Sequence, residues 1–130
     1  MTRWDSATAA RVSAPEEIQV VTTRRDGSFR APRIIWVVAV GERVFIRSTN
    51  GRGADWFRAA IATGRGRLVV SGTAHDVVFV EAEVTHLPDI DMAYRHKYGR
   101  YAAIVDHLLE TGPRSATLEV LPEPTPTWEN

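Results

Sequence analysis

Cysteine is absent from the 130 residues of this chain. Disulfide bonds, thiolate nucleophiles and zinc sites with cysteine ligands are therefore excluded. Long apolar runs are absent as well, since the longest, Ile34 to Val40, is far too short to cross a bilayer. The first residues lack the apolar core of a secretory signal. We therefore expect a cytoplasmic protein that does not insert into a membrane.

Lysine is nearly absent: Lys97 is the only one, and the other fifteen basic residues are arginine. Charge is also distributed unevenly. From Arg24 to Arg67 there are ten arginines and three acidic residues, whereas from Leu68 onward there are ten acidic and four basic residues. The basic segment could hold a phosphorylated or otherwise anionic ligand, although codon bias also produces arginine-rich chains. The net charge of zero disfavours a nucleic-acid partner.

The standard catalytic motifs are missing. There is no Gly-x-Ser-x-Gly elbow, no His-Glu-x-x-His helix and no phosphate loop ending in Gly-Lys. The four histidines lie ten or eleven residues apart, so no two share one helix face, and we expect no metal site. Glu81 and Glu83 share one face of a predicted strand and could act as an acid–base pair, but a solvated strand face is the simpler interpretation.

The composition is that of one ordinary globular domain, 44% hydrophobic and 25% charged. The domain is expected to span residues 1–130, with its core in 16–122 and an extended proline-rich tail over 123–130. Helices are predicted where apolar residues recur at helical spacing, over residues 6–12, 56–63, 90–98 and 101–109. Asp5 or Ser6 is expected to cap the first helix and Asp55 the second.

Six strands are predicted from apolar segments bounded by turn residues: 18–23, 33–40, 43–48, 67–71, 74–85 and 115–121. The nearly continuous apolar content of 33–40 implies burial on both faces, which in so small a protein suggests a subunit interface. Tight connections imply antiparallel pairing, and closure into a barrel would remove unprotected strand edges. The predicted fold class is α+β, a six-stranded antiparallel barrel with flanking helices.

The strongest candidate site is the segment from Arg47 to Gly53 together with the helix start at Trp56. Glycines let successive amides turn toward one anion, and a helix start adds partial positive charge. Charged donors are available from Arg47, Arg52 and Arg58. These features predict a phosphate cradle. Asp55 would compete with a ligand if it capped the helix amides, and an ordinary surface loop is the alternative.

Several stretches resemble a known superfamily. The strand, turn and strand RIIWVVAVGERVFIR (33–47), followed by Ser-Thr-Asn (48–50) and Trp-Phe-Arg (56–58), is similar to the FMN-binding split-barrel superfamily. That superfamily includes pyridoxamine 5′-phosphate oxidase and the deazaflavin-dependent reductases. AYRHKYG (93–99) and ATLEVLP (116–122) look like an uncharacterised branch of it, one of the domain-of-unknown-function families. The likeness covers residues 16–122.

The resemblance implies a six-stranded antiparallel split β-barrel, usually a homodimer, with flavin held at the subunit interface. By position, residues 47–50 match the groups that hold cofactor phosphate and ribityl, and Arg33 and Trp36 match the strand near the ring. The lysine that often follows the phosphate loop is missing, and Arg52 or Arg58 is expected to supply its charge. The expected cofactor-binding residues are Arg33, Trp36, Arg47, Ser48, Thr49, Asn50, Arg52, Trp56 and Arg58.

The resemblance favours a flavin- or deazaflavin-binding oxidoreductase, in which FMN or an 8-hydroxy-5-deazaflavin coenzyme performs the hydride transfer. The alternative is a non-enzymatic binding protein for a flavin, haem or another planar anionic ligand. An RNA-binding surface built on the two Gly-Arg-Gly triplets is a weaker alternative, because two triplets do not make an arginine-glycine tract. Tyr94, Tyr98 and Tyr101 fit core packing better than a substrate pocket because of their helical spacing.

Overall fold

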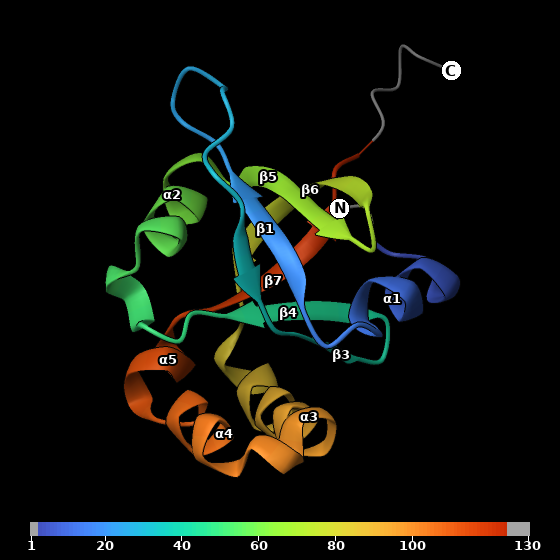
Figure 1. Cartoon of the computed structure of the whole chain (residues 1–130), viewed down its shortest axis with the longest axis vertical. Helices are drawn as coiled ribbons and strands as arrows, with labels where there is room; N and C mark the ends of the chain where they lie inside the picture. Colours follow the sequence, from blue (N-terminus) through green and yellow to red (C-terminus); the bar gives the residue numbers. More distant parts are fainter. Residues whose placement is uncertain (1–2, 125–130) are drawn as a thin grey trace.

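The computed structural model describes residues 3–124. Seven strands form one antiparallel sheet in the order β2-β1-β5-β6-β7-β4-β3. They are β1 Ile18–Thr22, β2 Arg33–Ile35, β3 Val37–Val40, β4 Arg43–Arg47, β5 Arg65–Val70, β6 Thr73–Glu81 and β7 Thr117–Pro122. β2 and β3 follow each other in sequence but lie at opposite ends of this order, so the sheet curls until its two edges approach (Figure 1). The result is a nearly closed split barrel.

The predicted antiparallel split β-barrel with flanking helices is confirmed, with seven strands in place of six. The predicted strand 33–40 is interrupted at Trp36, because its first half pairs with β1 and its second half with β4. A single apolar run gives no signal for such a change of partner. The prediction that this run is buried on both faces is only partly right, since Ile34 is 68% exposed. The strand predicted over 74–85 ends at Glu81.

Among residues 3–124, five α-helices flank the barrel: α1 Ser6–Ser13, α2 Asp55–Thr63, α3 Leu87–Tyr98, α4 Ala102–Leu108 and α5 Thr111–Ser115. Short 3-10 turns lie at Gly51–Gly53, Val84–His86 and Gly99–Tyr101. Figure 1 shows α3, α4 and α5 gathered on one side of the barrel, with α1 and α2 on its flanks. Within this part of the chain, no helix is long and apolar enough to cross a bilayer.

The two predicted helix caps have different outcomes. Asp5 caps α1 as predicted, and its carboxylate accepts a hydrogen bond from the Thr8 amide at 2.8 Å. The prediction for Asp55 is wrong, because Asp55 is already the first residue of α2. Ala54 occupies the cap position and offers no side-chain acceptor. The amides at the start of α2 are therefore not capped by a carboxylate. Of the predicted tail, residues 125–130 lie outside the described residues.

Apolar side chains form two clusters, one on each face of the sheet. The first fills the barrel and packs against α2, and the second lies between the outer face of β3–β4 and the helices α3 and α4. Strand β4 contributes to both, since Val44 and Ile46 point to the first cluster and Phe45 to the second. Tyr94 and Tyr98 are buried in the second cluster, as their helical spacing predicts.

Candidate functional site

A pocket of about 680 Å³ opens where β2, the end of β4 and α4 meet. Seven of the nine predicted site residues line it: Arg33, Trp36, Arg47, Ser48, Thr49, Asn50 and Trp56. Six residues that sequence reasoning did not single out complete its wall: Glu17, Pro32, Ile34, Ile35, Ile104 and Leu108. We call this hollow the Trp36 pocket. Its volume lies in the range typical of cofactor and small-molecule sites.

The aromatic wall of the Trp36 pocket is held by stacking. The indole of Trp36 lies on the ring of Tyr98, with the ring centroids 3.9 Å apart and the planes 1° from parallel. The Tyr98 hydroxyl donates to the Glu16 carbonyl at 2.7 Å and accepts from the Val37 amide at 3.1 Å. Burial raises the pKa of Tyr98 to about 12, so it stays protonated. Trp36 is therefore fixed before any ligand arrives.

Apolar side chains on the same wall remain open to solvent. Ile34 is 68% exposed and Ile104 is 46% exposed. Both line the Trp36 pocket, one from β2 and one from α4. Covering such exposed apolar side chains with a ring or another protein surface lowers the free energy.

Arg47 is the centre of a buried polar network. Its side chain is 0% exposed. Nε donates to Thr117 Oγ1 at 2.8 Å, and Nη1 donates to Asp91 Oδ1 at 2.9 Å and to the Leu108 carbonyl at 3.0 Å. The other oxygen of Asp91 accepts from Arg114 Nε at 2.8 Å. Arg47 thus joins β4 to α3, α4 and β7, and most of its donors are already used by the protein itself.

Arg52 and Arg58, the remaining two predicted residues, do not line the Trp36 pocket. Arg52 Nη1 donates to Glu81 Oε1 at 2.6 Å and to the Ser115 carbonyl at 2.8 Å. The hydrogen bond from Arg52 lowers the pKa of Glu81, which makes Glu81 an ion-pair partner. Arg58 Nη2 lies 3.8 Å from Asp55 Oδ1 on the protein surface. All three arginines of the predicted cradle therefore face carboxylates of the chain itself.

The loop after β4 contacts helix α4. Gly51 adopts a left-handed φ of 73°, and its amide donates to the Ser48 carbonyl at 3.1 Å. His107 Nε2 lies 2.8 Å from the Thr49 carbonyl, and its Nδ1 lies 3.0 Å from Glu110 Oε1. The contact with the Thr49 carbonyl, together with Glu110, raises the pKa of His107. No local signal in the sequence links His107 to this loop.

Two buried polar atoms at the Trp36 pocket have no hydrogen-bond partner among the described residues. They are Ser48 Oγ and Arg47 Nη2. Both residues line the pocket. Buried polar atoms without a partner are uncommon in folded proteins and are costly. Oxygen atoms of a ligand are suited to supply the missing contacts.

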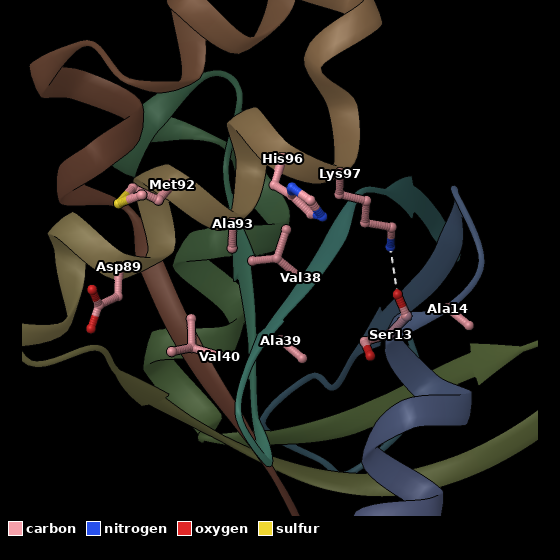
Figure 2. A pocket seen from close by; sticks show the side chains of 10 residues that line it. All are labelled: Ser13, Ala14, Val38, Ala39, Val40, Asp89, Met92, Ala93, His96 and Lys97. Carbon is pink, nitrogen blue, oxygen red and sulfur yellow. Dashed lines mark hydrogen bonds between the residues drawn. The ribbon is translucent and has the colours of Figure 1, made fainter.

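A second hollow, of about 780 Å³, lies between β3, α3 and the end of α1 (Figure 2). We call it the α3 pocket. Its apolar residues are Ala14, Val38, Ala39, Val40, Met92 and Ala93, and its polar ones are Ser13, Asp89, His96 and Lys97. Figure 2 shows His96 and Lys97 at one end of the pocket and Met92 and Asp89 at the other. This hollow is more apolar than the Trp36 pocket.

Lys97, the only lysine, is a structural contact at the rim of the α3 pocket. Its ammonium donates to the carbonyls of Ser13 at 2.6 Å, Pro15 at 2.7 Å and Val37 at 2.6 Å. Burial lowers the pKa of Lys97 to about 8. A compact ammonium with three donors fits three converging carbonyls, which a planar guanidinium cannot do.

Comparison with solved structures finds the same fold in proteins of known ligand type. The heme storage protein HutZ from Vibrio cholerae matches with a TM-score of 0.65 at 13% identity, over 95% of this chain and 93% of that one. An FAD-binding protein from Mesorhizobium loti matches with a TM-score of 0.55 at 14% identity, over 93% and 91%. A heme binding protein from Mycobacterium smegmatis matches with a TM-score of 0.58 at 15% identity, over 93% of this chain and 52% of that one. At these identities the comparison establishes the fold alone.

The fold thus defines a split-barrel protein of the kind that the sequence resemblance predicts. Within that class, the chain belongs to the family described as "Uncharacterized protein conserved in bacteria (DUF2255)", whose profile matches residues 8–120. No curated protein matches the chain in the sequence comparison. The predicted split-barrel fold and the predicted membership of an uncharacterised domain family are therefore both confirmed.

Proposed function

We propose that this protein binds a flavin or deazaflavin cofactor in the Trp36 pocket and acts as an oxidoreductase. The observation that supports this most directly is the pocket itself. It combines a fixed aromatic wall, two exposed isoleucines and the polar loop 48–50 in one hollow of cofactor size. The same fold in an FAD-binding protein adds support.

The residues present fit a flavin in two respects. Trp36, Ile34 and Ile104 offer apolar surface for a planar ring, and Thr49 and Asn50 offer exposed polar groups. The orphaned atoms Ser48 Oγ and Arg47 Nη2 suit ligand oxygens. When bound, the flavin would supply the hydride chemistry. The chain's own part is to bind the ring, orient it against Trp36 and exclude water from one of its faces.

We also propose that the protein is a homodimer that closes over this pocket. Ile34, on the edge strand β2, and Ile104, on α4, form apolar surface at the Trp36 pocket. A second copy laid against β2 and α4 would cover both side chains and complete the wall of the site. Size-exclusion chromatography with light scattering gives the mass directly, and a monomer at working concentrations would remove this part of the proposal.

Two measurements test the oxidoreductase. The absorption spectrum of the protein purified from its native host is expected to show flavin or deazaflavin bands. Stopped-flow mixing of the reconstituted protein with a nicotinamide donor and then an acceptor is expected to show reduction and reoxidation of the bound cofactor. Cofactor binding without turnover would indicate that the protein is a carrier and not an enzyme. A failure to bind either cofactor would remove the proposal.

The second candidate is a non-enzymatic haem-binding protein, and the α3 pocket favours it. This hollow is larger and more apolar, and it has an imidazole, His96, at one end (Figure 2). Histidine is a common axial ligand of haem iron. Two split-barrel proteins of the same fold are described as heme storage and heme binding proteins. Haem titration is expected to give a shifted Soret band that His96→Gln abolishes. The matched control is His75→Gln, since His75 lies on β6 outside the α3 pocket, and this variant should preserve the band. An unshifted band with wild-type protein rejects this candidate.

A further inference from the structure

A small basic hollow adjoins the Trp36 pocket. It has a volume of about 180 Å³ and is lined by Thr22, Arg24, Arg30, Ala31, Arg33 and Trp56. We call it the arginine pocket. Arg33 and Trp56 line both this hollow and the Trp36 pocket, so the two hollows meet at these side chains. At 180 Å³ the arginine pocket is below the size of an independent ligand site, which makes it a subsite of the larger one.

The arginines of this hollow differ from those of the predicted cradle. Within residues 3–124, no ion pair includes Arg24, Arg30 or Arg33. No carboxylate lines the arginine pocket, since Glu17 and Asp55 line only the neighbouring hollows. Three guanidinium groups around one hollow without a counter-charge repel one another unless an anion lies between them.

The backbone fixes where two of these arginines lie. Arg24 and Arg30 lie on the two sides of a hairpin that connects β1 to β2. The Arg24 amide donates to the Ser28 carbonyl at 2.8 Å, and the Arg30 amide donates to the Thr22 carbonyl at 2.8 Å. The Arg24 side chain also donates to the Phe29 carbonyl at 2.8 Å, which leaves its other nitrogens free for a ligand. The hairpin backbone therefore fixes the Cα positions of both arginines, and the contact with Phe29 holds the Arg24 guanidinium in place.

We propose that the arginine pocket binds the phosphate group of the ligand whose ring lies in the Trp36 pocket. This inference rests on the proposed function for the ring, and it places the anion site on the hairpin 23–32 and β2 in place of the loop 48–53. Guanidinium forks match phosphate oxygens in pairs, and Arg33 and Trp56 connect the two parts of the site. The ligand class is a phosphorylated planar cofactor such as FMN, in preference to its form without the phosphate, riboflavin.

The test compares FMN with riboflavin, which differ only by the phosphate. Binding is measured by quenching of flavin fluorescence for wild type, Arg30→Gln and Arg25→Gln. Arg25 is exposed on the same hairpin but does not line the pocket, so it is the matched control. Arg30→Gln is expected to weaken FMN binding about tenfold and to leave riboflavin binding unchanged. Arg25→Gln is expected to change neither.

The result that overturns the inference is specific to the phosphate. If Arg30→Gln leaves FMN affinity unchanged while Arg52→Gln weakens it, the anion site lies at the loop after β4. Riboflavin binding by wild type would then still support the ring site. If neither flavin binds, calorimetry with inorganic diphosphate separates the two proposals. Diphosphate binding that Arg30→Gln weakens supports the arginine pocket without the flavin function, and no diphosphate binding rejects both.

Discussion

Removing the carboxylate of Asp91, the partner of the buried Arg47, is expected to cost much of the protein's stability. Arg47 is 0% exposed, and within residues 3–124 its only charged partner is Asp91, at 2.9 Å. Asp91→Ala would leave a buried guanidinium without a counter-charge, which typically costs about 3–5 kcal/mol. Domains of this size are stable by about 5–15 kcal/mol, so the loss is a large fraction of the total. The melting temperature is expected to fall by roughly 15 °C.

The assay is urea denaturation followed by circular dichroism. Asp106→Ala is the matched control, because Asp106 forms a 3.6 Å ion pair with Arg95 in which both side chains are exposed. Exposed pairs contribute less than about 1 kcal/mol. Replacing Arg47 with Met and Asp91 with Leu together is expected to recover much of the stability, since the fully buried charge of Arg47 is removed together with its partner. Equal small losses for Asp91→Ala and Asp106→Ala would refute the reasoning.

Three further predictions test separate parts of the structure. Gly66→Ala should destabilise by about 3 kcal/mol in urea denaturation, because a Cβ would lie 2.1 Å from the Val21 carbonyl oxygen, whereas Gly53→Ala meets nothing within 4 Å and should be tolerated. Lys97→Arg keeps the charge but cannot reach all three carbonyls, so a loss of about 2 kcal/mol is expected by the same assay, and equal stability would contradict the geometry. NMR titration should give a higher pKa for His107 in the folded protein than in the urea-unfolded protein. The contribution of His107 to stability is therefore complete below pH 6.5 and is lost as pH rises through the folded-state pKa. A lower pKa in the folded protein would contradict this prediction.

The pattern of local structure could be predicted where it depends on neighbouring residues. Alternating apolar residues, the Asp5 cap and the glycine end of α2 at Gly64 all follow from short-range chemistry. The break at Trp36 could not be predicted, because it depends on which strand each half of the run pairs with. That choice is made by distant segments, β1 for one half and β4 for the other.

At the site, too, features set by residues near in sequence could be predicted, and features set by distant residues could not. The resemblance identified residues 47–50 and Trp36, which lie close together in sequence, and the structure brings them into one pocket. The local charge balance suggested that Arg47 and Arg52 are free, but Asp91 and Glu81, which lie 44 and 29 residues away from them, neutralise both. Partners at such separations have no signal in a single sequence.

The most direct test of the central proposal is the affinity of FMN for the wild type and for two charge-introducing variants. Ile104 and Ile61 are exposed to similar extents, 46% and 43%, but only Ile104 lines the Trp36 pocket. A carboxylate at either position should therefore be tolerated by the fold. We predict that Ile61→Glu binds FMN like the wild type and that Ile104→Glu binds it at least about tenfold more weakly. Equal affinity in all three proteins, or no binding by the wild type, would contradict it.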